Sequence, residues 1–135
     1  MSEKQIFIEQ VSPFDVATTV EKLIAAAIQK DWQNPETHNL QQSLAKAGKE
    51  VRPVQVVEIC KPEYSGRMLE KNHERIVSVM MPCRISVYEK DDGKAYVALL
   101  NMESMADGLP PAAIDAVRGA AAETLEIVRS VIGKF

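Results

Sequence analysis

The chain has 135 residues, a hydrophobic fraction of 46% and a formal net charge of −3 at pH 7. This length and apolar content predict a single domain over residues 1–135, with a core large enough to fold without disulfides. The slightly acidic balance argues against nucleic acid as the main partner, because domains that bind phosphate backbones usually carry a basic face.

Neither a membrane span nor an export signal is visible in the sequence. No apolar stretch reaches membrane-spanning length, and the polar start over Met1–Gln5 lacks the long apolar run of a secretory signal. The expected location is therefore the cytoplasm, without a membrane partner. In that compartment the two cysteines, Cys60 and Cys83, are expected to be free, metal-bound or redox-active rather than permanently crosslinked.

The first part of the chain predicts a strand followed by two helices. Residues 4–10 predict a short strand. Ser12, followed by proline, predicts a helix cap, and an apolar stripe then continues to about Lys30. Asn34, again followed by proline, predicts the cap of a second helix that ends at Gly48 in the left-handed conformation. The region Lys71–Glu74, which contains one of the two histidines of the chain, is expected to be a solvated loop.

The rest of the chain predicts three more strands and two helical stretches. A β-branched run predicts a strand at Val51–Ile59, and two runs around a tight Asp-Asp-Gly turn predict strands at 84–90 and 94–101. Apolar residues at helical spacing predict helices at 63–80 and 111–132. The 63–80 stretch is expected in one or two pieces, broken near Asn72.

The order β-α-α-β-α-β-β-α predicts an α+β fold with two layers. In it, a mainly antiparallel sheet of about four strands packs against helices. Both faces of the 51–59 strand carry apolar side chains, with Val54 and Val56 on one face and Val57 and Ile59 on the other. The second face is therefore either buried in a homodimer or covered by the 34–48 helix and the loops of the same chain.

The two cysteines stand at the inner ends of two predicted strands. Cys60 and Cys83 lie at the same end of the sheet if the strands are antiparallel, and at opposite ends if residues 61–82 cross over between parallel strands. Neighbouring thiols would form a reversible disulfide, or bind a soft transition metal or haem. The alternative is that both are small buried hydrophobes and that no cofactor is present.

Few other side chains are candidates for a site with the cysteines. His38 is the best third metal ligand, facing either the Cys60 end of the sheet or water. Glu58, on the Cys60 strand, would tune the thiolate or act as an acid or base; otherwise it is a surface carboxylate. Arg84, next to Cys83, would lower a thiolate pKa or bind an anion, although strand alternation points it to the opposite face.

Methionine is the other abundant soft side chain. Of the six methionines, Met80 and Met81 lie just before the second cysteine, Met102 and Met105 follow the last strand, and Met68 lies in the 63–80 stretch. They are either ligands for copper(I) or haem iron, or adaptable core fillers. The nucleotide-binding, serine-hydrolase and zinc-protease motifs are absent, so the sequence assigns no reaction and leaves open whether the protein is an enzyme.

Two motifs, Glu58-Ile59-Cys60-Lys61-Pro62 and Met81-Pro82-Cys83-Arg84-Ile85, resemble the domain-of-unknown-function 302 family, in its branch with E-[LI]-C-x-P and M-P-C-R-[IV]. The resemblance covers nearly the whole chain. It implies a compact α+β fold, typically a homodimer, and no established activity. The remaining positions that match the family pattern are His38, Leu40, Gln41, Gly48, Asp92, Gly93 and Asn101, with Asn39 where the family often has aspartate.

Two hypotheses of function follow. The first is a thiol site of Cys60 and Cys83, supported by His38 and Glu58, that is redox-active or binds a soft metal or haem. The second is a homodimeric binding module without chemistry, in which both cysteines are buried core residues. It would hold a small ligand between the sheet and a helix, in an apolar pocket with few polar groups, or bind a partner protein.

Overall fold

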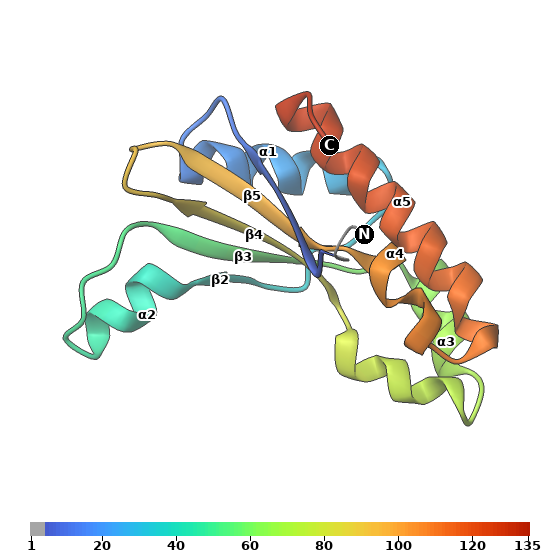
Figure 1. Cartoon of the computed structure of the whole chain (residues 1–135). Helices are drawn as coiled ribbons and strands as arrows, with labels where there is room; N and C mark the ends of the chain where they lie inside the picture. Colours follow the sequence, from blue (N-terminus) through green and yellow to red (C-terminus); the bar gives the residue numbers. More distant parts are fainter. Residues whose placement is uncertain (1–4) are drawn as a thin grey trace.

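The computed structural model describes residues 5–135 and confirms the α+β fold, with helices packed against an antiparallel sheet (Figure 1). The strands are β1 (Phe7–Val11), β2 (Thr37–Asn39), β3 (Val54–Ile59), β4 (Cys83–Glu89) and β5 (Ala95–Leu100). The α-helices are α1 (Val16–Gln29), α2 (Leu40–Lys46), α3 (Pro62–Leu69), α4 (Met102–Met105) and α5 (Pro111–Ile132). Two 3-10 helices, η1 (Glu74–Met80) and η2 (Ala106–Gly108), complete the order.

The five strands lie in the order β1-β5-β4-β3-β2, and each neighbouring pair is antiparallel. The sheet therefore has one more strand than the approximate four of the sequence prediction. The missing strand is β2, which is three residues long and pairs with β3 through His38 and Val56. So short a strand has no periodicity of its own, and its pairing with β3 defines it.

One face of the sheet forms the main core. Val57, Ile85 and Val97 on neighbouring strands are fully buried there, together with Leu23 of α1 and Ile127 of α5. Figure 1 shows α1 and α5 on the same side of the sheet. Burying an aliphatic side chain of this size contributes about 1.5–3 kcal/mol, so this layer supplies much of the driving force for folding.

The opposite face of the sheet is only partly covered. It carries the alternate residues of the same strands, among them Val56, Ala98 and the exposed Phe7 and Leu100. Helix α2 lies against β3 but buries none of its own residues. The predicted apolar second face is thus present and remains open in a single chain.

Helix α1 begins later than predicted. Asp15, not Ser12, caps it, since the Asp15 carboxylate accepts a hydrogen bond from the Thr18 N–H at 2.8 Å. Ser12 is buried and its hydroxyl lies 2.7 Å from the Thr19 hydroxyl. The prediction of a Ser12 cap was wrong because a contact one turn into the helix occupies that side chain.

The second predicted helix is also shorter than expected. The Asn34 amide donates to the Glu58 carbonyl at 2.7 Å and so ties the chain to β3, while Asn39 caps α2 by accepting from the Gln42 N–H at 3.0 Å. The Asn34 cap was therefore wrong, and His38 lies on a strand rather than in a helical turn. Gly48 does adopt the predicted left-handed conformation, with φ of +80°.

The remaining predicted elements are present, with two shifted starts: β1 begins at Phe7 instead of residue 4, which lies outside the described residues, and β3 begins at Val54 instead of Val51. The 63–80 stretch forms α3 and η1, separated at the expected break, and the last helix spans the predicted residues. The four-residue α4 and the adjoining η2, between β5 and α5, were not predicted. No helix within residues 5–135 combines the length and apolar character needed to cross a membrane.

Candidate functional site

The two cysteines lie at the same end of the sheet. Strands β3 and β4 are antiparallel neighbours, with Ile59 opposite Cys83, and Cys60 follows Ile59 directly. Cys60 is itself held by Gln33, whose backbone N–H donates to the Cys60 carbonyl at 2.7 Å and whose carbonyl accepts from the Cys60 N–H at 2.9 Å. The antiparallel alternative of the sequence analysis is thus the correct one.

Both cysteines are free thiols, and they have different surroundings. Cys83 packs against the core, where burial raises the pKa of its thiol to about 11 and the nearby Cys60 adds to the increase. Cys60 donates from Sγ to the Ser65 hydroxyl at 3.7 Å, on α3. Cys83 is therefore an uncharged thiol at neutral pH.

The other predicted site residues gather on the open face of the sheet. The His38 Nε2 atom lies 3.0 Å from Glu58 Oε2, and Arg84 Nε lies 3.8 Å from the same oxygen. His38 and Arg84 are substantially exposed, whereas the Glu58 side chain is largely buried. Over residues 5–135, no three histidine, cysteine, aspartate or glutamate side chains come together as a group that could hold a metal ion.

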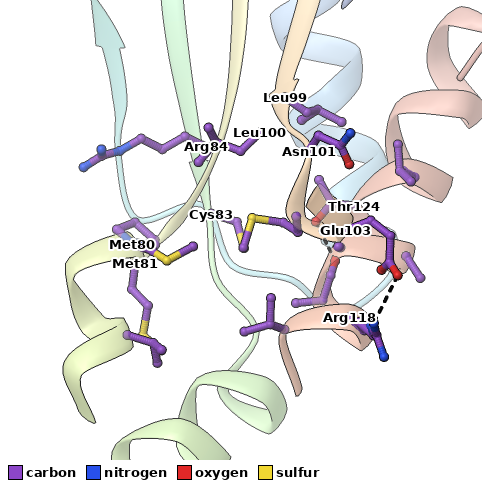
Figure 2. Close-up of a pocket in the computed structure, with 18 of the residues that line it drawn as sticks. Met80, Met81, Cys83, Arg84, Leu99, Leu100, Asn101, Glu103, Arg118 and Thr124 are labelled. Atoms are coloured by element: carbon purple, nitrogen blue, oxygen red, sulfur yellow. Dashed lines mark hydrogen bonds and ion pairs between the residues drawn. The ribbon is translucent and has the colours of Figure 1, made fainter. Parts of the chain in front are cut away.

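A cavity of about 390 Å³ opens beside Cys83, between the end of the sheet, η1, α4 and α5 (Figure 2). Its wall is mostly apolar and includes four methionines, Met68, Met80, Met81 and Met102. The apolar remainder comprises Ile8, Val77, Val79, Pro82, Leu99, Leu100, Val117, Ala120, Ala121, Ala122 and Leu125. Side chains from five separate segments therefore build one mostly apolar chamber.

The polar groups on this wall are few, and they differ in whether they already have a hydrogen-bond or ion-pair partner. The Thr124 hydroxyl donates to the Ala120 carbonyl at 2.8 Å, so its proton is already used. Asn101 precedes α4 without capping it, and its side-chain amide has no hydrogen-bond partner among residues 5–135. Arg118 pairs with Glu103 at 3.2 Å, at the edge of the chamber in Figure 2.

The sequence analysis proposed an apolar pocket between the sheet and a helix and singled out the methionines and Cys83, but it did not place the pocket beside Cys83. Arg118, Glu103 and Thr124 carried no signal, because they lie on helix faces whose spatial neighbours come from distant parts of the chain. A hint existed in the position of Met102 directly after the last strand. The unpredicted helix α4 is the element that closes this side of the pocket.

A polar cluster lies near Cys60, on the other side of α5. The Glu123 carboxylate accepts from Lys61 Nζ at 2.9 Å, from Trp32 Nε1 at 3.1 Å and from the Tyr64 hydroxyl. Burial alone would raise the pKa of Glu123, but these hydrogen bonds hold it below its ordinary value. The cluster joins α3 and α5, so it supports one wall of the pocket from outside.

Comparison with known proteins gives a family and a fold. The family model described as "Domain of unknown function DUF302" matches residues 8–134. The crystal structure of an uncharacterized conserved protein DUF302 from Bacillus stearothermophilus is similar, with a TM-score of 0.82 and 17% sequence identity over 95% of this chain and 99% of that one. None of the curated proteins matches.

Proposed function

Because the chain belongs to the family called Domain of unknown function DUF302, a name that carries no activity, we propose a function from the pocket itself. The protein binds a small, largely apolar molecule between the end of the sheet and α5. The observation that carries this proposal is the chamber of about 390 Å³ with a mostly apolar wall.

The size and lining of the chamber support ligand binding. Small-molecule pockets occupy about 300–1,000 Å³ and present a mostly hydrophobic wall with a small number of polar groups. Four methionines add flexible thioether side chains, which adjust to ligands of different shape. Cys83 acts here as an uncharged wall residue, in keeping with the raised pKa of its thiol.

The test is binding of a neutral apolar fluorophore, N-phenyl-1-naphthylamine, followed by fluorescence. Ala121→Phe fills the chamber from α5 and is expected to weaken binding at least tenfold. The matched control is Ala112→Phe, because Ala112 is exposed on the same helix and does not line the pocket. A wild-type protein that fails to bind the fluorophore, or an Ala121→Phe variant that binds it equally well, contradicts the proposal.

A thiol site is the second candidate function, supported by the position of both cysteines at one end of the sheet. In the redox form, Cys60 and Cys83 lose two electrons and two protons to a disulfide oxidant such as oxidised glutathione and become a disulfide. In the metal form, they bind a soft metal or haem, with His38 as the third ligand after local rearrangement. The proposed location is the cytoplasm, where the resting state would be two thiols.

Two measurements test the thiol site. Equilibration with glutathione redox buffers followed by intact mass should show the loss of two hydrogen atoms, which Cys60→Ser should abolish. Elemental analysis and an absorption spectrum of anaerobically purified protein test metal and haem. Protein that keeps two free thiols throughout and carries neither metal nor haem contradicts this candidate.

We also propose that two chains associate through the open face of the sheet. Support comes from its apolar residues, among them Val56, Ala98 and the exposed Phe7. Charges of both signs lie on the same face, including Glu9, bound to Lys90 at 2.9 Å. A surface of mixed charge around an apolar centre can be complementary to itself under two-fold symmetry.

A further inference from the structure

We propose that the ligand of this pocket is a monocarboxylic acid with one apolar tail, and that Arg118 binds its carboxylate. This inference rests on the proposed binding function and adds the chemical class of the ligand. The tail occupies the chamber among the methionines, and the carboxylate remains at the edge where Arg118 lies.

Three charged residues lie on the pocket wall: Arg84, Glu103 and Arg118. Arg84 extends away from the chamber in Figure 2 and lies 3.8 Å from Glu58 on the open face. Arg118 is thus the cation available at the pocket.

The present partner of Arg118 is easily replaced. Its guanidinium lies 3.2 Å from the Glu103 carboxylate, and the two side chains are 52% and 69% exposed. Ion pairs in such contact with water contribute little to stability. A ligand carboxylate whose tail is buried in the chamber can therefore displace Glu103 and receive the two parallel N–H donors that a guanidinium offers.

The interior of the chamber is compatible with this arrangement. The Cys83 thiol is uncharged and so does not repel an anion. The Asn101 side-chain amide, which has no partner within the described part of the chain, supplies a further donor on the wall. The deeper residues, such as Met68 and Val117, are buried and apolar, which suits a hydrocarbon tail.

The experiment is displacement of N-phenyl-1-naphthylamine at neutral pH by decanoate, decanol and decyltrimethylammonium. These probes share one tail and differ in the charge of the head. Decanoate is expected to bind roughly tenfold more tightly than decanol, and the cation most weakly, because a charge-assisted hydrogen bond is worth about one order of magnitude in affinity.

Two variants should move decanoate affinity in opposite directions. Arg118→Met should weaken decanoate about tenfold and leave decanol unchanged. Glu103→Gln, which frees the guanidinium, should strengthen decanoate and again leave decanol unchanged. Arg75→Met is the matched control, because Arg75 is exposed and lies outside the pocket.

The possible outcomes separate the two proposals. Equal binding of decanoate and decanol, or variants that change both alike, overturns the carboxylate assignment and leaves the apolar pocket standing. Failure of the fluorophore and of all three probes to bind overturns the pocket and the carboxylate assignment together.

Discussion

Gly119 lies so close to Tyr64 that a Cβ atom added to it would stand 2.7 Å from the Cε1 atom of the tyrosine ring. The ring cannot move away freely, because its hydroxyl is bound to Glu123. We therefore expect Gly119→Ala to lower the free energy of unfolding by about 1–2 kcal/mol, since overpacking outweighs the better helix propensity of alanine. Chemical denaturation measures this change.

Gly66→Ala is the control for that substitution. Gly66 also lies in a helix, α3, but its added Cβ would meet only Glu70 Oε1 at 3.6 Å, an ordinary contact. We expect it to be neutral or to stabilise the protein by up to about 1 kcal/mol. Similar effects of the two substitutions would show that the approach of Gly119 to Tyr64 is not tight.

The carboxylate of Glu123 should make stability depend on acid pH. Its pKa in the folded protein lies below the ordinary 4.5, so the folded state binds fewer protons than the unfolded state. The stabilisation is fully present above pH 4.5 and is lost as the pH falls through the lowered value. Glu123→Gln should cost roughly 1–2 kcal/mol at neutral pH and much less at low pH. Urea denaturation across this range measures the difference; a gap that stays constant would contradict the prediction.

The Cys83 thiol should react slowly at neutral pH. With a pKa of about 11, only a very small fraction is thiolate at neutral pH, and alkylation by iodoacetamide should rise about tenfold per pH unit toward pH 11. The Cys60→Ser variant isolates this thiol for mass spectrometry. Denatured protein, in which the thiol titrates near 9.0, is the control. A native profile centred at or below that value would contradict the burial of Cys83.

Association through the open sheet face can be tested at Phe7. This side chain is 66% exposed on that face and does not line the pocket. We expect wild-type protein to sediment at twice the chain mass of 15.0 kDa and Phe7→Glu to sediment as a monomer. Ile76→Glu, which alters a similarly exposed residue on η1, should leave the dimer intact. A monomeric wild-type protein would rule out this association at the concentration used.

The regular elements could be predicted because their residues carry a clear periodicity. The β-branched run before Cys60 predicts a strand and the long apolar stripe of α5 predicts a helix. Neither prediction needs knowledge of contacts with distant residues. The antiparallel pairing of β3 and β4 was one of two alternatives, and only the structure decides it. The predictions at Ser12 and Asn34 failed where a tertiary hydrogen bond used a side chain that was also suited to capping.

An apolar pocket between the sheet and a helix was one hypothesis from the sequence, but its position and lining could not be predicted, because no single segment of the chain contains it. Its wall joins η1, the start of β4, the end of β5 and the middle of α5, and sequence spacing does not reveal which faces of these elements meet. In the sequence, nothing distinguishes Arg118 from other charged helix residues. Its pairing with Glu103 of α4 is visible only in the structure. By contrast, the predicted roles of Cys60 and His38 concern chemistry rather than position, and they stay predictions.

Cys83 forms part of the wall of the proposed pocket, so the reactivity of its thiol would depend on whether the pocket is occupied. Any occupant would shield its sulfur, so the thiol is a natural occupancy sensor that requires no label and no knowledge of the occupant. Protein taken directly from cells can be alkylated under native conditions at high pH and compared with the same protein after organic extraction and refolding, so that unfolding does not account for the difference. A thiol that is more reactive in the extracted and refolded protein would show that the protein carried cargo in vivo, and the solvent phase would contain that cargo for identification.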